Sequence, residues 1–164
     1  MADLDIEEVI RSGYAHFNRE HEPPPTWLPD GEFVNSREDP DHATYSGIEA
    51  IGPPVVGVHG NVDSADLRRL LPEERVVEAE GARIAMVHDA GPRTGRLERM
   101  RRRFGDRADL VVFGHSHTPL HEEAPDGFQI LNPGSPTERR RAPSHTMGLI
   151  RVARGLAACD LIRF

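Results

Sequence analysis

Hydrophobic and polar residues follow two different periods along this chain, and the periods predict a mixed α/β fold. Apolar positions recur at helical spacing over residues 3–19, and a run of three prolines then ends any helix. From about residue 51 onward the pattern changes to short apolar runs separated by polar loops. We therefore expect an N-terminal helix and an irregular segment, followed by a strand-rich body.

The pattern after residue 51 predicts the elements of that body. Helical spacing indicates helices over 65–71 and 94–104. Short β-branched and apolar runs indicate strands over 55–58, 75–80, 82–87, 110–113, 128–131, 146–152 and 157–163. Two pairs of these strands are predicted to form hairpins, because a glycine lies between their members.

Charge divides the chain near the place where the hydrophobic pattern changes. The 164 residues carry a net charge of −7 and contain no lysine. Residues 1–50 hold 12 acidic residues and 3 arginines, whereas residues 51–164 hold 15 acidic residues and 17 arginines. This asymmetry favours a boundary near residue 50. An acidic chain without interleaved aromatic and basic residues also argues against nucleic-acid binding.

Composition restricts the expected compartment. The single cysteine, Cys159, excludes an internal disulfide framework and a thiolate metal cluster. No stretch is apolar enough to predict a membrane span, and no signal-peptide pattern opens the sequence. The sequence therefore predicts a cytoplasmic protein that binds no membrane.

Side chains that can bind metals follow three of the predicted strands. Asn61 follows the first strand, His88 follows 82–87, and His115 and His117 follow 110–113 after a glycine. Ligands gather at strand ends in α/β folds, so these side chains can share one site. Imidazole nitrogens and amide oxygens suit divalent transition metals. Taken alone, the His-Ser-His sequence is also compatible with a surface turn that binds nothing.

Four motifs resemble those of the calcineurin-like metallophosphoesterases, in particular the small YfcE-type phosphodiesterases. They are Gly60-Asn61-Val62-Asp63, Val87-His88-Asp89, Gly114-His115-Ser116-His117 and Asn132-Pro133-Gly134-Ser135. The resemblance covers about residues 51–164. It implies an α/β fold of two packed β-sheets flanked by helices. It also implies two metals that share a bridging hydroxide, which attacks phosphorus.

The resemblance further implies residue roles. Asn61, His88 and His115 would bind one metal, and His117 would reach toward the other. Asn61 would also touch the phosphate, so Asn61, His88 and His117 form the expected catalytic set. The run Arg139-Arg140-Arg141 is expected to line the phosphate entrance, with Arg139 as the substrate-binding residue. The expected cofactor is Mn²⁺, with Zn²⁺, Ni²⁺ or Fe²⁺ as alternatives, and the expected substrate is a small phosphate ester.

Asp63 and Val62 in the first motif have expected roles other than metal binding. Asp63 is expected to orient neighbouring groups rather than to bind metal. Many family members carry a histidine at the position of Val62, where it is a candidate acid for the leaving group. Since valine donates no proton, the resemblance favours diesters or esters with good leaving groups. The alternative interpretation of Val62 is a buried apolar residue.

The first third of the chain departs from the family pattern. The family's two opening strands, which end in Asp-x-His and Gly-Asp, have no counterpart before residue 51. Instead, segments 12–19, 28–30, 36–41 and 44–47 look like the start of a SnoaL-like or ketosteroid-isomerase-like domain. We therefore expect a SnoaL-like fragment over 1–50 and a metallophosphoesterase-like domain over 51–164 that lacks its first two strands. An exposed sheet edge then predicts low stability or self-association.

The leading hypothesis is a metal-dependent phosphodiesterase impaired by the missing ligands. Without a bridging carboxylate two divalent ions repel strongly, so one metal at Asn61, His88 and His115 is expected. The alternative is an inactive metallophosphoesterase-like protein that binds a metal or a partner. A third hypothesis is an isomerase module that uses His16, Asp39 and His42. It is disfavoured because the SnoaL-like family forms a cone of helices around a curved sheet, and residues 1–50 would supply only about half of that cone, which cannot enclose an apolar pocket.

Overall fold

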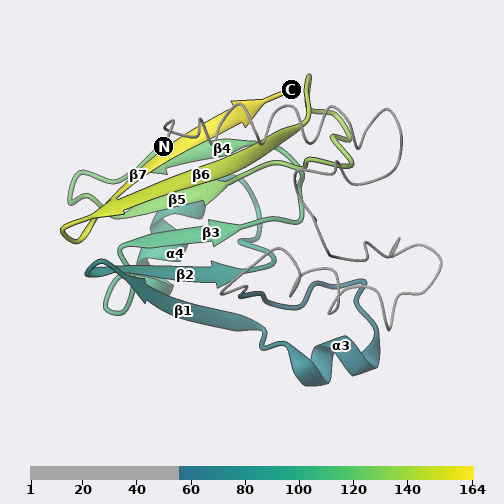
Figure 1. Cartoon of the computed structure of the whole chain (residues 1–164), viewed down its shortest axis with the longest axis horizontal. Helices are drawn as coiled ribbons and strands as arrows, with labels where there is room; N and C mark the ends of the chain where they lie inside the picture. The colour runs from purple at the N-terminus through teal and green to yellow at the C-terminus, as the bar shows by residue number, and fades with distance from the viewer. Residues whose placement is uncertain (1–55) are drawn as a thin grey trace, which may run out of the picture.

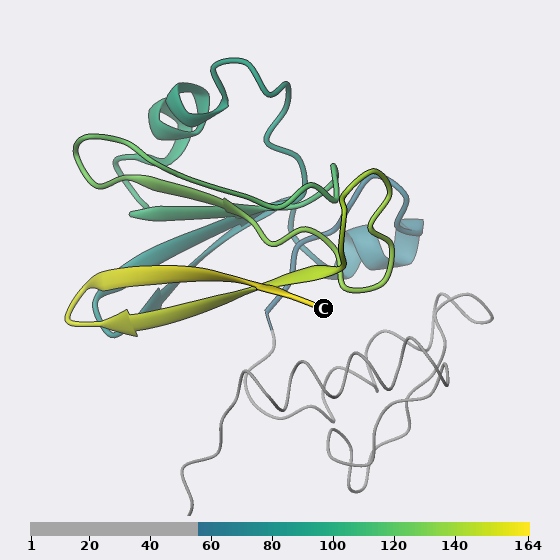
Figure 2. The same cartoon turned by 90° about the horizontal axis from the view of Figure 1, so that it is seen from above.

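The computed structural model describes residues 56–164, which form three layers (Figures 1 and 2). The helices are α3 (Ala65–Leu70) and α4 (Arg96–Phe104). The strands are β1 (Glu74–Ala79), β2 (Ala82–Val87), β3 (Leu110–Phe113), β4 (Leu120–Glu123), β5 (Gln129–Asn132), β6 (Thr146–Ala153) and β7 (Leu156–Arg163). The predicted helix over 3–19 and the SnoaL-like fragment over 1–50 lie outside the described residues.

Five strands form a mixed sheet in the order β1-β2-β3-β5-β4, and β6 and β7 form a two-stranded sheet. Strands β2, β3 and β5 run parallel, with Val87 opposite Phe113 and Val112 opposite Leu131. Their carboxyl ends therefore meet at one edge of the sheet (Figure 1). The predicted α/β architecture of two packed sheets is confirmed.

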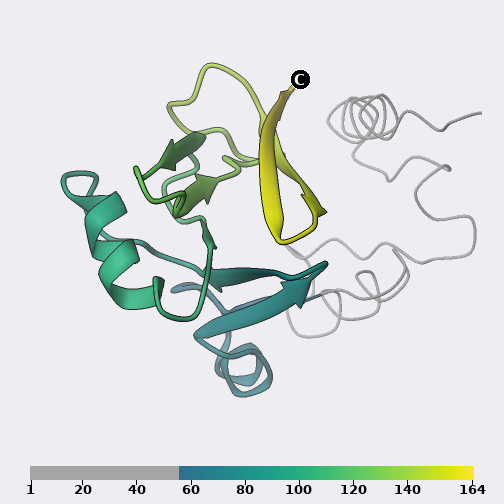
Figure 3. The same cartoon turned by 90° about the vertical axis from the view of Figure 1, so that its left-hand side faces the viewer.

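The central strands are apolar on both faces because both faces are covered. Val111 and Phe113 lie in one core cluster with Met100 and Phe104 of α4. Leu110, alternating with these residues, lies in a second cluster against the β6–β7 hairpin, to which β6 and β7 contribute partly buried apolar side chains. Figure 3 shows the hairpin and α4 on opposite sides of the sheet. Parallel strands that are covered on both faces have sequences that are hydrophobic at nearly every position.

Most predicted elements are present, with small shifts at their ends. Helix α3 begins after Ser64, whose Oγ accepts a hydrogen bond from the Leu67 N–H at 3.2 Å. Helix α4 begins at Arg96, two residues later than predicted, because Gly95 has a left-handed φ of 66°. The predicted strand over 55–58 is not found in its described part, 56–58. Strand β4 was not predicted from the sequence.

Two further findings concern the surface. None of the helices among residues 56–164 is long and apolar enough to cross a membrane. Within the same residues β6 and β7 pair only with each other. The predicted self-association through an open sheet edge stays a prediction.

We expect Glu74→Gln to lower the free energy of unfolding by about 0.5–1 kcal/mol at pH 7, the range of a well-formed but partly exposed ion pair. Glu74 accepts hydrogen bonds from Arg107 at 2.5 Å and Arg103 at 2.7 Å, which join β1 to α4 and to the segment that follows it. The bond from Arg107, aided by that from Arg103, holds the pKa of Glu74 below its ordinary value, although burial opposes this effect.

The sign of the pH dependence follows from the lowered pKa. The stabilisation is present above the ordinary carboxyl pKa and is lost as the pH falls through the lower, folded-state pKa. Urea melts at pH 7 and at about pH 3 measure this, and the two proteins should converge at the lower pH. Glu78→Gln on the same strand is the control, because Glu78 makes no ion pair within residues 56–164. A constant difference at both pH values would contradict the assignment.

Candidate metal centre

Three ligand-type atoms meet at the carboxyl edge of the parallel strands. His88 Nε2 lies 2.8 Å from Asn61 Oδ1 and 3.1 Å from His115 Nδ1, and the distance between Asn61 Oδ1 and His115 Nδ1 is 3.2 Å. His88 follows β2 directly, and His115 follows β3 after one glycine. The structure thus brings together Asn61, His88 and His115, three of the four predicted metal ligands.

The triangle formed by these atoms has the size of one face of a metal coordination shell. With metal–ligand bonds of about 2.1 Å, neighbouring ligands of an octahedron lie about 3.0 Å apart. Two imidazole nitrogens and one amide oxygen therefore fit a divalent transition metal. No three His, Cys, Asp or Glu side chains among residues 56–164 gather in this way. The third ligand here is an amide.

The environment of His88 favours the form that can bind a metal. Burial, and then the positive charge of His115 when protonated, lowers the pKa of His88. A neutral imidazole keeps the lone pair that a metal requires. A cavity of about 210 Å³ opens beside it. Its lining includes Asn61, His88, Asp89, Arg68 and Arg103.

The loop that carries Asn61 is held by its own side chains. The Gly60 N–H donates to Asp63 Oδ2 at 2.6 Å, which agrees with the orienting role predicted for Asp63. Arg68 of α3 donates to the backbone oxygens of Asn61 at 2.5 Å and Asp63 at 3.0 Å. Val62 at the tip is 87% exposed, so its interpretation as a buried apolar residue is wrong. A loop side chain with no neighbouring element to cover it stays in solvent.

The turn that carries His115 and His117 has an unusual backbone. Both histidines have left-handed φ angles, 65° and 56° respectively, and such residues cluster at functional sites. The fully buried Asn132 holds this turn. Its Nδ2 donates to Gly114 O at 2.9 Å and to Ser116 Oγ at 3.1 Å, and its Oδ1 accepts from the Gly134 N–H at 2.9 Å.

His117 lies on the same turn but outside the triangle. Its Nδ1 is 2.5 Å from the backbone oxygen of Glu138, which makes Nδ1 the protonated ring nitrogen. Nε2 therefore keeps a free lone pair, as in many metal-binding histidines whose other nitrogen donates to a carbonyl.

Within the predicted arginine run, the residue that contacts the histidine turn is Arg140 and not Arg139, the one chosen from the sequence. Arg140 donates from Nη1 to His115 O at 3.0 Å, and its φ of 49° is left-handed. The predicted phosphate-binding residue, Arg139, donates from Nη1 to Ala142 O at 2.8 Å within its own turn. Three consecutive arginines are alike in sequence, and only the backbone of the turn shows which one contacts His115.

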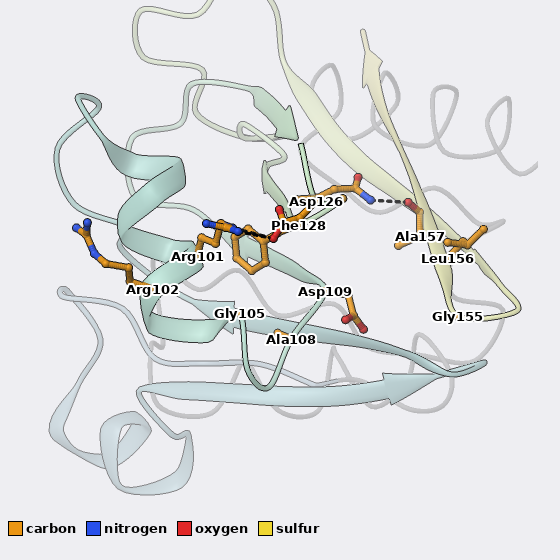
Figure 4. Close-up of a pocket in the computed structure, with 12 residues that line it drawn as sticks. Arg101, Arg102, Gly105, Ala108, Asp109, Asp126, Phe128, Gly155, Leu156 and Ala157 are labelled. Carbon is orange, nitrogen blue, oxygen red and sulfur yellow. Dashed lines mark hydrogen bonds and ion pairs between the residues drawn. The ribbon is translucent and has the colours of Figure 1, made fainter. Parts of the chain in front are cut away.

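A larger cavity, of about 510 Å³, lies at the opposite edge of the sheet (Figure 4). Several of its polar groups are already paired, since Arg101 binds Asp126 at 2.7 Å and the Gln129 side chain donates to Ala157 O at 2.9 Å. It surrounds the beginnings of β3 and β5, whereas the triangle lies beyond the ends of β2 and β3. It is therefore separate from the candidate metal centre.

These motifs and their geometry agree with a comparison with known families. A model of the calcineurin-like phosphoesterase superfamily domain matches residues 32–155, about three quarters of the chain. The chain belongs to this superfamily. The match begins before the boundary near residue 50 that the charge pattern predicts, and that boundary stays a prediction. No curated protein matches.

Solved structures similar to this calcineurin-like chain include protein TM1076 of Thermotoga maritima. It is 28% identical with a TM-score of 0.50, over 66% of this chain and 65% of that one. The chain thus spans just under two thirds of TM1076. A Vps29 single mutant from Entamoeba histolytica is 21% identical with a TM-score of 0.58, over 80% and 78% of the two chains. Vps29 of that organism complexed with Zn²⁺ is 21% identical with a TM-score of 0.55, over 73% and 74%.

The superfamily implies divalent metal, and Asn61, His88 and His115 are the residues that would hold it. We expect Gly60→Ala to weaken metal binding about 10–100-fold, the usual effect of disturbing a ligand's support. A Cβ at residue 60 would lie 2.9 Å from two atoms of the His88 ring, which would have to move. Isothermal titration with Mn²⁺ and Zn²⁺ measures the effect.

The matched control for this substitution is Gly57→Ala. A Cβ there would meet only Leu71 Cδ2, at an ordinary 3.9 Å. Its metal affinity should equal that of the parent protein. Equal affinity in Gly60→Ala would mean that His88 does not need its present position to bind metal.

Proposed function

We propose that this chain is a metal-dependent phosphodiesterase of YfcE type. The observation that carries the proposal is the convergence of Asn61 Oδ1, His88 Nε2 and His115 Nδ1 within 2.8–3.2 Å of one another in a calcineurin-like phosphoesterase. A divalent ion, Mn²⁺ in the first place, would activate water and polarise a phosphoryl oxygen there. The substrate would be a small phosphodiester.

The chain's own residues supply positioning. Because Asn61 Oδ1 faces the two imidazoles, its Nδ2 is left to donate to a phosphoryl oxygen. His117, with Nδ1 donating to Glu138 O, would present Nε2 to the metal site. The fixed turn around Asn132 keeps His115 and His117 in place before substrate arrives, which reduces the cost of reaching the reactive arrangement.

The exposed Val62 limits the leaving group. It offers no proton to the departing oxygen, so the oxygen must leave as an anion. Esters with acidic leaving groups, such as aryl diesters, therefore suit this site better than simple alkyl monoesters. The substrate preference rests on this one side chain.

A second candidate function is metal or partner binding without turnover. It is favoured by the two carboxylates near the triangle, which are turned to the backbone. Asp63 accepts from the Gly60 N–H at 2.6 Å, and Asp89 accepts from the Gly91 N–H at 2.7 Å. Among residues 56–164 no carboxylate joins Asn61, His88 and His115 in the triangle. A single metal would leave the phosphoryl clamp incomplete.

The test uses the full chain, freed of metal by a chelator and reloaded with Mn²⁺, Zn²⁺, Ni²⁺ or Fe²⁺. Turnover of bis-p-nitrophenyl phosphate and p-nitrophenyl phosphate is measured together with metal content. We expect metal-dependent hydrolysis that is faster for the diester. Stoichiometric metal without any hydrolysis would support the second candidate. A chain that binds none of these metals would overturn the phosphodiesterase proposal and the metal-binding form of the second candidate.

A further inference from the structure

A small basic pocket lies next to the histidine turn, on the side of α4. It has a volume of about 270 Å³. Its lining consists of Arg93, Arg96, Ser116, Thr118, Pro119 and Leu120. Two cations and two hydroxyls line it, and no carboxylate does. Neither the metal triangle nor the proposed reaction uses these side chains.

Arg96 is fixed in place with much of its hydrogen-bonding capacity unused. Its Nε and Nη2 donate to the backbone oxygen of Gly91 at 3.2 and 2.7 Å, and its guanidinium carbon lies 4.9 Å from the centre of the Phe113 ring. A guanidinium has five N–H donors, so three remain.

No carboxylate among residues 56–164 forms an ion pair with Arg96. Burial, and next the neighbouring Arg99, lowers the pKa of Arg96, while the charges of Asp89 and Glu122 partly oppose this effect. A neutral carbonyl accepts a hydrogen bond but does not cancel a positive charge. A bound anion would remove this electrostatic cost.

Ser116 directs a donor toward the same pocket. Its Oγ accepts from Asn132 Nδ2 at 3.1 Å and from the Thr118 N–H at 3.3 Å. A hydroxyl has two acceptor positions and one O–H donor. With both acceptor positions occupied, the O–H is left to donate, and it has no acceptor within residues 56–164.

We propose that this pocket binds a tetrahedral oxyanion, with Arg93, Arg96 and the Ser116 hydroxyl as its donors. Arginines and hydroxyls in this combination match a phosphate group in charge and in donor geometry. Ser116 lies between His115 and His117 in the chain, so the pocket adjoins the metal centre. The anion is therefore either free phosphate or a second phosphate of a substrate whose diester lies at the metal centre. Only the latter source rests on the proposed function.

The first arm of the test needs no hydrolysis. The full, metal-free chain is titrated with inorganic phosphate and followed by ³¹P NMR. Arg93→Gln should weaken binding about 10-fold, the value of one charge-assisted hydrogen bond. Arg93 is exposed, and its side chain makes no hydrogen bond or ion pair among residues 56–164, so this variant should fold normally. Arg102→Gln, at an exposed arginine of α4 that does not line this pocket, is the control and should bind as the parent does.

Ser116→Ala provides an independent check, because it removes the hydroxyl donor without changing charge, and should also weaken phosphate binding. No phosphate binding by the parent, or equal binding by the parent, Arg93→Gln and Arg102→Gln, would overturn the proposal. These results do not depend on catalysis, so they remain interpretable if the protein proves not to hydrolyse diesters.

The second arm distinguishes the two sources of the anion in the metal-loaded chain. Values of KM are compared for bis-p-nitrophenyl phosphate and for a diester that carries an additional terminal phosphate. If the pocket binds the substrate's second phosphate, Arg93→Gln should raise the KM for the latter about 10-fold more than for the former. If it binds free phosphate, the two KM values should change in parallel, while inhibition by inorganic phosphate weakens.

Discussion

Replacing His115 and His117 together by alanine should abolish stoichiometric metal binding and reduce turnover of bis-p-nitrophenyl phosphate by at least about 100-fold. His115 Nδ1 is one corner of the ligand triangle, 3.1 Å from His88 Nε2. His117 has its Nδ1 fixed by Glu138 O, which leaves Nε2 for a metal. Elemental analysis of the purified variant and steady-state kinetics measure the two effects.

The control for the double variant is His121→Ala. His121 lies on β4 and its Nε2 lies 2.8 Å from Gln129 Oε1, away from the triangle. The single variants separate the two histidines, because loss of metal in His115→Ala with retention in His117→Ala would indicate one ion at the triangle. Unchanged metal content and turnover in the double variant would refute the assignment of the site.

Asn132→Ala should lower the free energy of unfolding by about 2–4 kcal/mol and weaken metal binding about 10–100-fold. Asn132 is fully buried and holds Gly114 O, Ser116 Oγ and the Gly134 N–H. Its removal takes one of two donors from Gly114 O and leaves the part-buried Gly134 N–H without its acceptor, which costs more than the hydrogen bond itself contributes. The turn then loses the contacts that orient His115.

Gln129→Ala is the matched control, because it removes another amide from the same strand. Gln129 binds His121 and Ala157 O at the opposite end of β5. Urea melts should show reduced stability in both variants, but metal titration should show reduced affinity in Asn132→Ala alone. Equal losses of affinity would mean that metal binding depends on general stability, not on the turn.

Much of the fold could be predicted because its strands carry their own pattern. Residues 110–113 are apolar throughout, as a strand covered on both faces requires. Strand β4, Leu120–Glu123, carries one apolar residue among polar ones, and it forms because β5 pairs with it. Likewise the β-branched run that begins at Val55 suggested a strand over 55–58. Residues 56–58 nevertheless join no ladder, because a strand needs a neighbour as well as a propensity.

In the site, the type of each side chain could be predicted from the sequence, but its position could be predicted only where the order of the strands determines it. The triangle was predictable because Asn61, His88 and His115 each follow a run of apolar residues, and β2 and β3 end at the same sheet edge. The contact of Arg140 with His115 O was not, since the left-handed turn at residue 140 distinguishes it from Arg139. The exposure of Val62 was not predictable either, because it depends on which elements cover the loop.

The parallel arrangement of β2, β3 and β5 also separates the chain's turns into two groups. The β1–β2 and β6–β7 turns meet where the Gly155 N–H donates to Glu80 O at 2.8 Å, and the β4–β5 turn contains Gly127, around which a Cβ would meet nothing within 4 Å. All three lie at the edge away from the ligand triangle. A fusion partner, an affinity tag or new chain termini could be placed at Gly127 without steric conflict with the metal centre. That edge is the natural point for attachment and immobilisation.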